Sequence, residues 1–425
     1  MSEWVRAVIG IEDPVAQRNF TANVMDGALF ALGMSFVSQQ AILPVFVKAI
    51  GGGNIAVGMI PVLWTFGFNF PQVFIARYAQ RAREKKSLLL LTAMAQRMPW
   101  LLLSLIPFVL AGRVGTGGVL AAFFILYALA AIAGSINLPV WFDLIAKLTP
   151  LEVRGRLFAI RNLLGSVFGI GGGAVAALIL GTMLYPASYA FLFSLAFVSL
   201  MLSYYFLTRL EEKAPELPVA GVPGIRLAEA LPRILRTRGN YRNYLVGDAL
   251  LISSNMANGF FAVHAIEKFS LSDAAAGAFT MVIAGSVIVG SLLFGYLADH
   301  HGHRLNMLLA GMFTLLACVA ALLAQTPELY AASFVCSASS LTLSGISRLP
   351  LIAELCSVAE RPTYVALSNM VTSPFVLAGV LGGWIANAWG FPALFMTTGV
   401  LALSALLWWL LVVEEPRGRH AVGAA

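Results

Sequence analysis

Long apolar runs separated by short polar segments dominate the chain. A helix of about 20 residues is long enough to cross the hydrocarbon core of a bilayer. Twelve runs reach that length, at Thr21–Val47, Ile55–Tyr78, Leu88–Ala111, Val119–Trp141, Gly155–Gly181, Ala187–Thr208, Tyr244–Ile266, Ala274–Leu297, Leu305–Ala324, Glu328–Leu349, Thr363–Trp389 and Ala393–Val413. The pattern therefore predicts an all-α polytopic membrane protein with twelve transmembrane helices.

The longest hydrophilic stretch, residues 209–242, divides these spans into two sets of six. Three prolines in it are typical of a linker: Pro215, Pro218 and Pro223. Its residues 226–238 are basic and carry leucine and isoleucine at helical spacing, which predicts an amphipathic helix on the inner leaflet. We therefore predict an N-terminal six-helix bundle at residues 1–208, a cytoplasmic linker at 209–242 and a C-terminal six-helix bundle at 243–425.

An internal repeat supports this division. The segment Leu144–Leu148 recurs as Leu351–Leu355 with one substitution, at a spacing of 207 residues. The same spacing relates three further pairs: Arg154 and Arg361, Asn162 and Asn369, Gly172 and Gly379. A weaker echo relates Asp26 to Asp248, near the starts of the first and seventh spans. Two related halves are typical of secondary transporters.

Composition and charge agree with a membrane protein. The chain has 425 residues, of which 59% are hydrophobic and 11% are charged, whereas a soluble domain carries roughly 25% charged residues. The net charge of +7 does not indicate nucleic-acid binding, because only Lys48, Arg113 and Lys268 of the 27 basic residues fall in the predicted odd-numbered loops. This bias predicts that the even-numbered loops and both termini are cytoplasmic, in a multi-pass cell-membrane protein.

The sequence carries no signal for an enzyme, a metal or a cofactor. Cys318, Cys336 and Cys356 lack the spacing of a disulfide framework or a zinc site. Adjacent histidines in a loop, such as His300 and His301, lack a rigid ligand geometry. The chain has neither a Walker sequence nor a Ser-His-Asp pattern. We therefore expect no cofactor, and as partners we expect a small-molecule substrate, membrane lipid and protons as the coupling ion, with a monomeric protein.

The segment Gly295–Arg304, between the eighth and ninth spans, combines an acid, a turn and a base. Gly295 would let two helices approach closely, because it has no Cβ. Asp299 closes the C-terminal end of a helix, where the macrodipole disfavours an anion, so it needs a partner elsewhere. Gly302 permits a tight reversal and Arg304 follows it. This spacing resembles the loop signature of the major facilitator superfamily, which joins helices two and three and often recurs between eight and nine.

The resemblance implies a fold of two six-helix halves and a cytoplasmic gate. In that family the acid of the signature contacts the start of a helix in the opposite half, so Asp299 would meet the start of the fifth span near Arg154. Further candidate gate residues lie at the ends of the fourth, fifth, tenth and eleventh spans: Asp143, Arg161, Glu354 and Arg361. The equivalent N-terminal loop departs from the signature, with Ala79 and Ala82 in place of the acid and the glycine.

Ionisable residues inside the spans are costly and need partners or a watery cavity. Arg97 lies near the middle of the third span and Asp26 lies within the first, so we predict an Asp26–Arg97 pair. Asp248 lies at the matching depth of the seventh span, and by the same count no basic residue of the C-terminal half lies at that depth. An unpaired acid there would carry a proton. The alternative is a hydrated Asp248 at the membrane surface near Arg242.

Neutral polar residues within the spans mark a candidate substrate cavity. They concentrate in the first, fourth, seventh and tenth spans, which line the central path in the superfamily. The candidates, one of them aromatic, are Gln39, Asn69, Tyr127, Asn137, Asn255, Asn258 and Ser340. Such groups suit a neutral or amphipathic molecule.

Glycines in the fifth span bear on the direction of transport. Gly165, Gly169 and Gly171–Gly173 resemble the glycine-rich motif of proton-coupled exporters, although close helix packing explains them equally well. We predict a secondary active transporter that works by alternating access and exports amphipathic compounds as a proton antiporter. The alternatives are an uptake symporter or facilitator for a polar metabolite, and a transport-inactive sensor or scaffold with the same fold.

Overall fold

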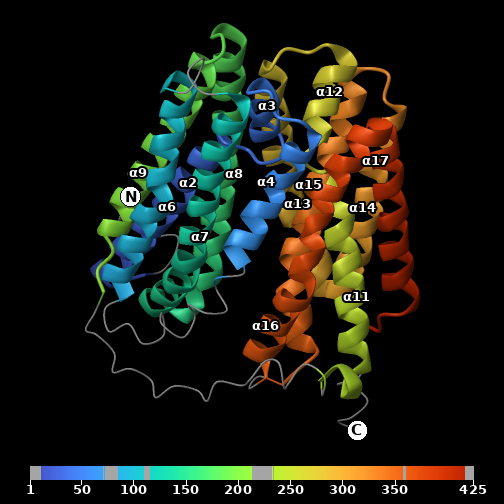
Figure 1. Ribbon diagram of the computed structural model, residues 1–425. Helices are drawn as coiled ribbons and strands as arrows, with labels where there is room; N and C mark the ends of the chain where they lie inside the picture. Colours follow the sequence, from blue (N-terminus) through green and yellow to red (C-terminus); the bar gives the residue numbers. More distant parts are fainter. Residues whose placement is uncertain are drawn as a thin grey trace. The chain divides into compact units, whose positions relative to one another are not determined.

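The computed structural model describes residues 11–69, 71, 85–109, 115–212, 232, 234–357 and 360–416 (Figure 1). Every regular element in these residues is a helix. The predicted signature-equivalent loop around Ala79 and Ala82 and most of the linker lie outside them. Of the predicted amphipathic helix at 226–238, residues 232 and 234–237 are described and are helical.

The first part of the chain forms α2 (Pro14–Ser35), α3 (Ile42–Ala49), α4 (Asn54–Asn69), α6 (Lys85–Val109), α7 (Thr116–Leu148), α8 (Leu151–Thr182) and α9 (Ala187–Thr208). The second part forms α11 (Gly239–Ser254), α12 (Phe261–Phe269), α13 (Ala274–His301), α14 (His303–Leu323), α15 (Pro327–Glu354), α16 (Arg361–Thr372) and α17 (Ala378–Leu411). Two 3₁₀ helices complete it, η2 (Asn255–Ala257) and η3 (Ser373–Leu377).

These elements supply the twelve predicted spans. Within the described residues, nine helical segments are long and apolar enough to cross a membrane. One of them, Thr363–Leu411, counts as two spans, because the backbone leaves the helical region at Gly390. The remaining two spans are the shorter apolar helix α4 and the pair α2–α3. The all-α architecture with two sets of six helices is therefore confirmed.

Two spans predicted as continuous helices are interrupted. The first is broken at residues 36–41 between α2 and α3, and the seventh is broken around η2 between α11 and α12. Both breaks fall where the sequence is rich in serine, glutamine and asparagine, whose side chains compete for backbone hydrogen bonds. The interruption thus occurs at corresponding places in the two related halves.

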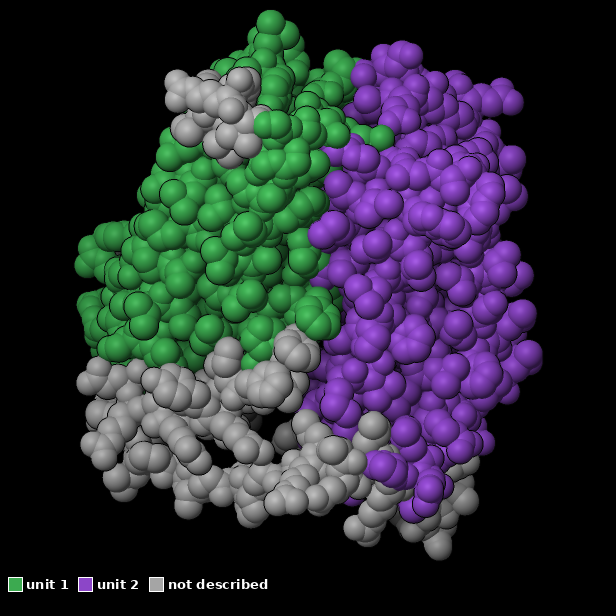
Figure 2. Space-filling view, viewed as in Figure 1, with its two compact units in different colours: residues 1–51, 63–222, 272–281 green, residues 52–62, 223–271, 282–425 purple. Residues whose placement is uncertain are grey.

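Contacts divide the chain into two compact units that differ from the predicted domains. Unit 1 comprises residues 1–51, 63–222 and 272–281, and unit 2 comprises the rest (Figure 2). Each unit therefore includes a short helical segment from the other half of the sequence. The division into 1–208, 209–242 and 243–425 stays a prediction.

Glycine allows these two segments to pack. A Cβ built at Gly58, in the segment of α4 assigned to unit 2, would clash with the backbone carbonyl of Gly379 in α17. A Cβ built at Gly277, in the segment of α13 assigned to unit 1, would clash with the backbone of Ala177 in α8. Close backbone approach between helices is the usual role of small residues in membrane proteins.

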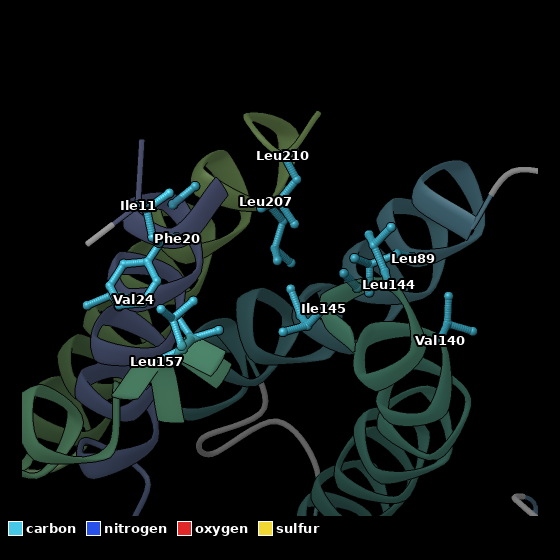
Figure 3. Close-up of a cluster of buried hydrophobic side chains, with 13 residues drawn as sticks. Ile11, Phe20, Val24, Leu89, Val140, Leu144, Ile145, Leu157, Leu207 and Leu210 are labelled. Carbon is cyan, nitrogen blue, oxygen red and sulfur yellow. The ribbon is translucent and has the colours of Figure 1, made fainter. Parts of the chain in front are cut away.

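Within unit 1, α2 packs against α8 and α9, and α6 packs against α7 and α9 (Figure 1). One end of these helices closes over a cluster of buried aliphatic and aromatic side chains (Figure 3). Phe20 and Val24 enter it from α2, Leu157 from α8 and Leu207 from α9. Ile145 contributes from α7.

Within unit 2, α14 packs against α15 and α17, and α11 packs against α17. The repeated letters of the sequence have matching environments. Leu144 and Ile145 at the end of α7 are at most 1% exposed, and Leu351 and Ile352 at the end of α15 are fully buried. The repeat therefore reflects equivalent core positions in the two halves.

Each half is also closed by the same asparagine contact. In unit 1, Asn19 Nδ2 donates to the carbonyl of Glu211 (3.1 Å), and Asn19 Oδ1 accepts from the Glu211 N–H (2.8 Å). In unit 2, Asn240 makes the same two bonds with the backbone of Glu414, both at 3.0 Å. The residue that follows the sixth or twelfth span is thereby tied to the start of the first or seventh span.

These contacts predict unequal losses of stability. The bonds of Asn19 are partly buried, whereas those of Asn240 are exposed to solvent. Asn19→Ala should lower the free energy of unfolding by about 1–3 kcal/mol, because it strands buried backbone groups. Asn240→Ala should cost less. Thermal unfolding of the purified protein in detergent would measure both, and an equal or reversed order would contradict this account.

Candidate functional site

A cavity of about 220 Å³ lies wholly within unit 1. Its wall combines aromatic rings with charged and amide side chains. It is lined by Asp26, Phe30, Trp64, Phe68, Gln96, Arg97, Gly134, Asn137, Leu138, Trp141, Arg161 and Leu207. A small concave site with an apolar wall and a few convergent polar groups is the usual form of a ligand site.

Asp26 is the carboxylate of this cavity. It lies in the middle of α2 and is 3% exposed. Its Oδ2 accepts a hydrogen bond from Arg161 Nη1 (2.8 Å) in α8, and its Oδ1 accepts one from the hydroxyl of Ser203 (2.6 Å) in α9. The sequence analysis assigned Arg161 to the cytoplasmic gate and did not identify Ser203.

Local packing guides Arg161 to this carboxylate. A Cβ at Gly27 would clash with the aliphatic stem of Arg161, so the missing side chain leaves room for it. Arg161 Nη1 also donates to the backbone carbonyl (2.7 Å) and side-chain oxygen (2.6 Å) of Asn23. The guanidinium lies 4.5 Å from the ring centroid of Trp141, within the range of a cation–π contact.

Arg97 completes the charged group and is almost fully buried, at 1% exposed. It donates to the carbonyls of Leu200 (2.8 Å) and Ala93 (3.0 Å) and to the hydroxyl of Ser203 (2.9 Å). Its Nη2 lies 3.8 Å from Asp26 Oδ1. The predicted Asp26–Arg97 pair is therefore present, but Ser203 bridges it and Arg161 is the direct partner of Asp26.

The prediction that Asp248 lacks a base is wrong. Asp248, in α11, is 2% exposed, and its Oδ2 accepts a hydrogen bond from Arg348 Nε (2.9 Å) in α15. Arg348 Nη2 also donates to the hydroxyl of Thr372 (2.9 Å). Because α15 continues to Glu354, Arg348 lies inside the helix and reaches the buried acid. The reason for assigning Asp248 as a free proton carrier is removed.

The two acids obtain their cations from different helices. The repeat spacing of 207 residues relates Trp141 to Arg348 and Arg161 to Ser368. In unit 1 the aromatic ring is on α7 and the base is on α8. In unit 2 the base is on α15 and the small hydroxyl is on α16. By this alignment the two halves carry the positive charge at different aligned positions.

Four predicted cavity residues belong to unit 1. Asn137 lines the cavity, as expected of its position. Tyr127 is instead fully buried among aromatic rings, 5.4 Å from Trp64 and 5.6 Å from Phe123 between ring centroids. Gln39 is half-buried in the break between α2 and α3. Asn69, half-buried at the end of α4, is likewise outside the lining set.

The three predicted cavity residues of unit 2 make structural hydrogen bonds. Asn258 Nδ2 donates to Asn255 Oδ1 (3.2 Å), and Asn258 Oδ1 accepts from the hydroxyl of Ser337 (3.0 Å). These bonds brace the break around η2. Ser340 is 2% exposed and bonds Thr314 (2.7 Å) and the carbonyl of Ala310 (2.9 Å) between α15 and α14. Helix packing accounts for Ser340 fully.

Several predicted gate residues bind the ends of neighbouring helices. Arg154 donates to the carbonyls of Ala146 (2.5 Å) and Thr149 (3.3 Å) at the end of α7. Arg304 donates to the carbonyls of Trp409 (3.1 Å) and Leu410 (2.8 Å) at the end of α17. A cation is favourable beside the carbonyls of a helix C-terminus. These two arginines therefore have a capping role within their own units.

Other gate candidates join helix ends or lie at the surface. Asp143 forms an ion pair with Lys85 between α7 and α6. Glu354 Oε1 lies 4.0 Å from His303 Nε2. Arg361 is exposed at the start of α16, and Asp299 lies in the last turn of α13. The predicted contact between Asp299 and the start of the fifth span stays a prediction.

The two glycines of the signature differ in outcome. Gly302 has φ +89° and directly precedes α14, which confirms the tight reversal. The close helix approach predicted at Gly295 is wrong for the described residues, because a Cβ built there has no heavy atom within 4 Å. At Gly302 both the positive φ and the Glu415 carboxyl, 2.7 Å from the position of a Cβ, favour glycine.

Comparison with known proteins gives a family-level match. The model of the Major Facilitator Superfamily matches residues 245–425. Human solute carrier family 22 member 7 is 29% identical over 131 residues, which are 31% of this chain and 24% of that protein. The match thus spans about a quarter of that relative's length.

Solved transporter structures match over nearly the whole chain. A mutant of the nucleoside transporter NupG gives a TM-score of 0.71 at 11% identity, covering 94% of this chain and 100% of that one. The D-xylose–proton symporter gives 0.70 at 14% identity, covering 94% and 98%. A bacterial homologue of the iron transporter ferroportin in the inward-facing state gives 0.70 at 16% identity, covering 92% and 98%. At these identities the likeness shows the fold.

The exchanged cation predicts a compensating double variant. Arg161→Ser should destabilise the protein by several kcal/mol, because it removes the direct partner of a buried carboxylate. Adding Trp141→Arg should recover part of that loss, since the double variant copies the arrangement around Asp248. Thermal unfolding of the single and double variants measures the coupling. If the two losses simply add, the positions are not equivalent.

Proposed function

Because residues 245–425 match the model of the major facilitator superfamily and the fold matches that of solved transporters, we propose that this multi-pass membrane protein is a member of that superfamily and a proton-coupled secondary transporter of an amphipathic small molecule. Transport would proceed by alternating access, as in other members with two related halves. We place substrate binding at the cavity around Asp26, Arg97 and Arg161. The observation that carries this proposal is a buried carboxylate–guanidinium pair on the wall of a cavity that also has aromatic sides.

The cavity suits an amphipathic molecule. Trp64, Phe68 and Trp141 provide flat apolar surface, and Gln96 and Asn137 provide amide hydrogen-bonding groups. The volume of about 220 Å³ is below the usual range for drug-sized ligands. A molecule with one or two rings, or a metabolite of similar size, matches these dimensions.

Asp26 is the proposed coupling group. Its carboxylate is held by Arg161 and Ser203, and a proton on Asp26 would remove the charge that holds Arg161. An ionisable residue within a membrane span that faces a cavity is the usual site of proton coupling. Asp248 is the matched acid of unit 2, and it does not line the cavity.

Two directions of transport have support from particular observations. Proton-driven export by antiport is favoured by the glycine-rich stretch of α8, and it is our first candidate. The glycines of that stretch also have a packing role, because a Cβ at Gly173 would lie 2.8 Å from Met281 of α13. Uptake by symport is the second candidate, and the surplus positive charge of the cavity favours it.

We propose that the protein lies in the cell membrane with both termini in the cytoplasm. The basic even-numbered loops support this orientation. Cysteines introduced at Arg83 and His301 should both react with a membrane-impermeant maleimide from the cytoplasmic side only. Labelling of the two sites from opposite sides would contradict the proposed topology and the parallel arrangement of the two halves.

Flux in proteoliposomes tests transport and coupling. We expect the purified protein to move at least one of three probes, 2-naphthoate, 2-naphthamide or 2-naphthylmethylamine, faster than protein-free vesicles. An imposed pH gradient should change the initial rate, and the sign of the change separates antiport from symport. Asp26→Asn should keep downhill flux and lose the response to the gradient.

Asp248→Asn is the matched control, since it removes an equally buried, arginine-paired carboxylate that does not line the cavity. Rates are compared per folded protein. We expect this variant to keep its response to the pH gradient. A response lost in Asp248→Asn and kept in Asp26→Asn would reverse the assignment. Binding of a probe without flux would support a transport-inactive sensor.

A further inference from the structure

We propose that the ligand of this cavity carries a negative charge, and that Arg161 binds its anionic group. The inference rests on the proposed function, because it specifies the substrate class of the same site. A carboxylate, a sulfonate or a phosphate ester on an aromatic or aliphatic body has the required chemistry. Of the neutral or amphipathic molecules expected from the sequence, this proposal keeps the amphipathic ones and gives them a negative charge.

The cavity wall carries more positive than negative charge. Among the residues that line the cavity, one carboxylate, on Asp26, faces two guanidinium groups, on Arg97 and Arg161. The site therefore carries a surplus positive charge within a membrane-spanning unit. A buried charge without a counter-ion costs several kcal/mol in such surroundings. A bound anion would supply the missing charge.

The two arginines differ in how they are held and in how far they are exposed. Arg97 is held on three sides by Leu200, Ala93 and Ser203, and its side chain is 2% exposed. It has the environment of a structural cation. The side chain of Arg161 is 16% exposed, so it is the more accessible of the two.

Arg161 forms its hydrogen bonds through one of its three guanidinium nitrogens. Its Nη1 donates all the hydrogen bonds that the structure gives it among the described residues, to Asn23 and Asp26. The edge formed by Nε and Nη2 makes none to those residues. A guanidinium edge with two parallel N–H groups matches the two oxygens of a carboxylate or phosphate.

Aromatic rings line the same cavity as Arg161. Trp141 lies under the Arg161 guanidinium, and Trp64 stacks near Phe68 with ring centroids 6.1 Å apart. All of these side chains line the cavity. An anionic group at Arg161 would therefore place the body of the molecule against flat apolar surfaces, where aromatic packing adds to binding.

The anion and Asp26 then compete for the same base. A bound anion would draw Arg161 away from Asp26 and weaken the hydrogen bond that holds the carboxylate. Conversely, a proton on Asp26 leaves Arg161 free for the anion. Binding of the two is mutually favourable by thermodynamic linkage. This cooperativity favours co-transport of the proton and the anion, the second candidate direction above.

The test compares probes of one shape and different charge. Binding of 2-naphthoate, 2-naphthamide and 2-naphthylmethylamine to the full-length protein in detergent is measured by isothermal titration calorimetry. We expect 2-naphthoate to bind at least tenfold more tightly than the amide. Arg161→Gln should abolish that preference, and Asp26→Asn should strengthen binding of 2-naphthoate at neutral pH, since it removes the competing carboxylate.

Arg348→Gln is the matched control, because it breaks the equivalent buried pair in unit 2 and lies outside the cavity lining. It should keep the preference for the acid even where it lowers stability. If Arg161→Gln does not fold, Arg161→Lys and Asp26→Asn decide the question. We expect Arg161→Lys to keep a reduced preference.

Equal binding of the acid and the amide, tighter binding of the amine, or no binding of any probe would overturn the inference. So would a preference for the acid that survives in Arg161→Gln. Loss of flux with the acid preference intact would instead remove the proposed function and leave the anion site. The two failures are therefore distinguishable.

Discussion

A carboxylate buried in a membrane-spanning helix must have a base beside it, and this constraint organises both halves of the protein. Charged side chains at the centre of a bilayer are costly by every scale. Asp26 and Asp248 occupy corresponding helices, and each is bonded to one arginine. The arginine comes from α8 in the first case and from α15 in the second. The requirement for a partner is thus shared, while the position of the partner is not.

The two ion pairs differ in what surrounds the arginine. Arg348 is bonded on two sides, to Asp248 and Thr372. Arg161 lies 4.5 Å from the ring centroid of Trp141 and donates its hydrogen bonds through Nη1, beside Arg97, whose Nη2 lies 3.8 Å from the same carboxylate. Both pairs join helices, and the pair of unit 1 also lines the cavity described above.

Much of the fold was predictable from the sequence, because membrane spans depend on long apolar runs and not on particular contacts. The repeat at Leu144–Leu148 was also readable, since equivalent core positions conserve their letters within the chain. The helix breaks beside α3 and α12 were not predicted. Apolar length alone does not report where serine and asparagine side chains replace backbone hydrogen bonds.

The site was predictable in its acids and less so in its bases. Asp26 and Arg97 stand out because they interrupt apolar runs. Arg161 lies near the start of its predicted span and Arg348 near the end of its own, so counting residues puts both close to the membrane surface. A long arginine side chain can extend several ångströms along a helix, and Gly27 opens the path for Arg161. Depth estimated from the backbone therefore misplaces arginine more than it misplaces aspartate.

The same reach lets two of the predicted gate arginines bind neighbouring helix ends. Arg154 and Arg304 each donate to the carbonyls at the end of a neighbouring helix in their own unit. Those carbonyls have no partner within their helix, and they attract cations wherever a basic loop follows a span. Arginines in the basic loops, such as Arg154 and Arg304, thus donate to the free carbonyls at helix ends. Those inside a span, such as Arg161, remain to balance charge, and it is their unequal distribution between the halves that gives one cavity its positive character.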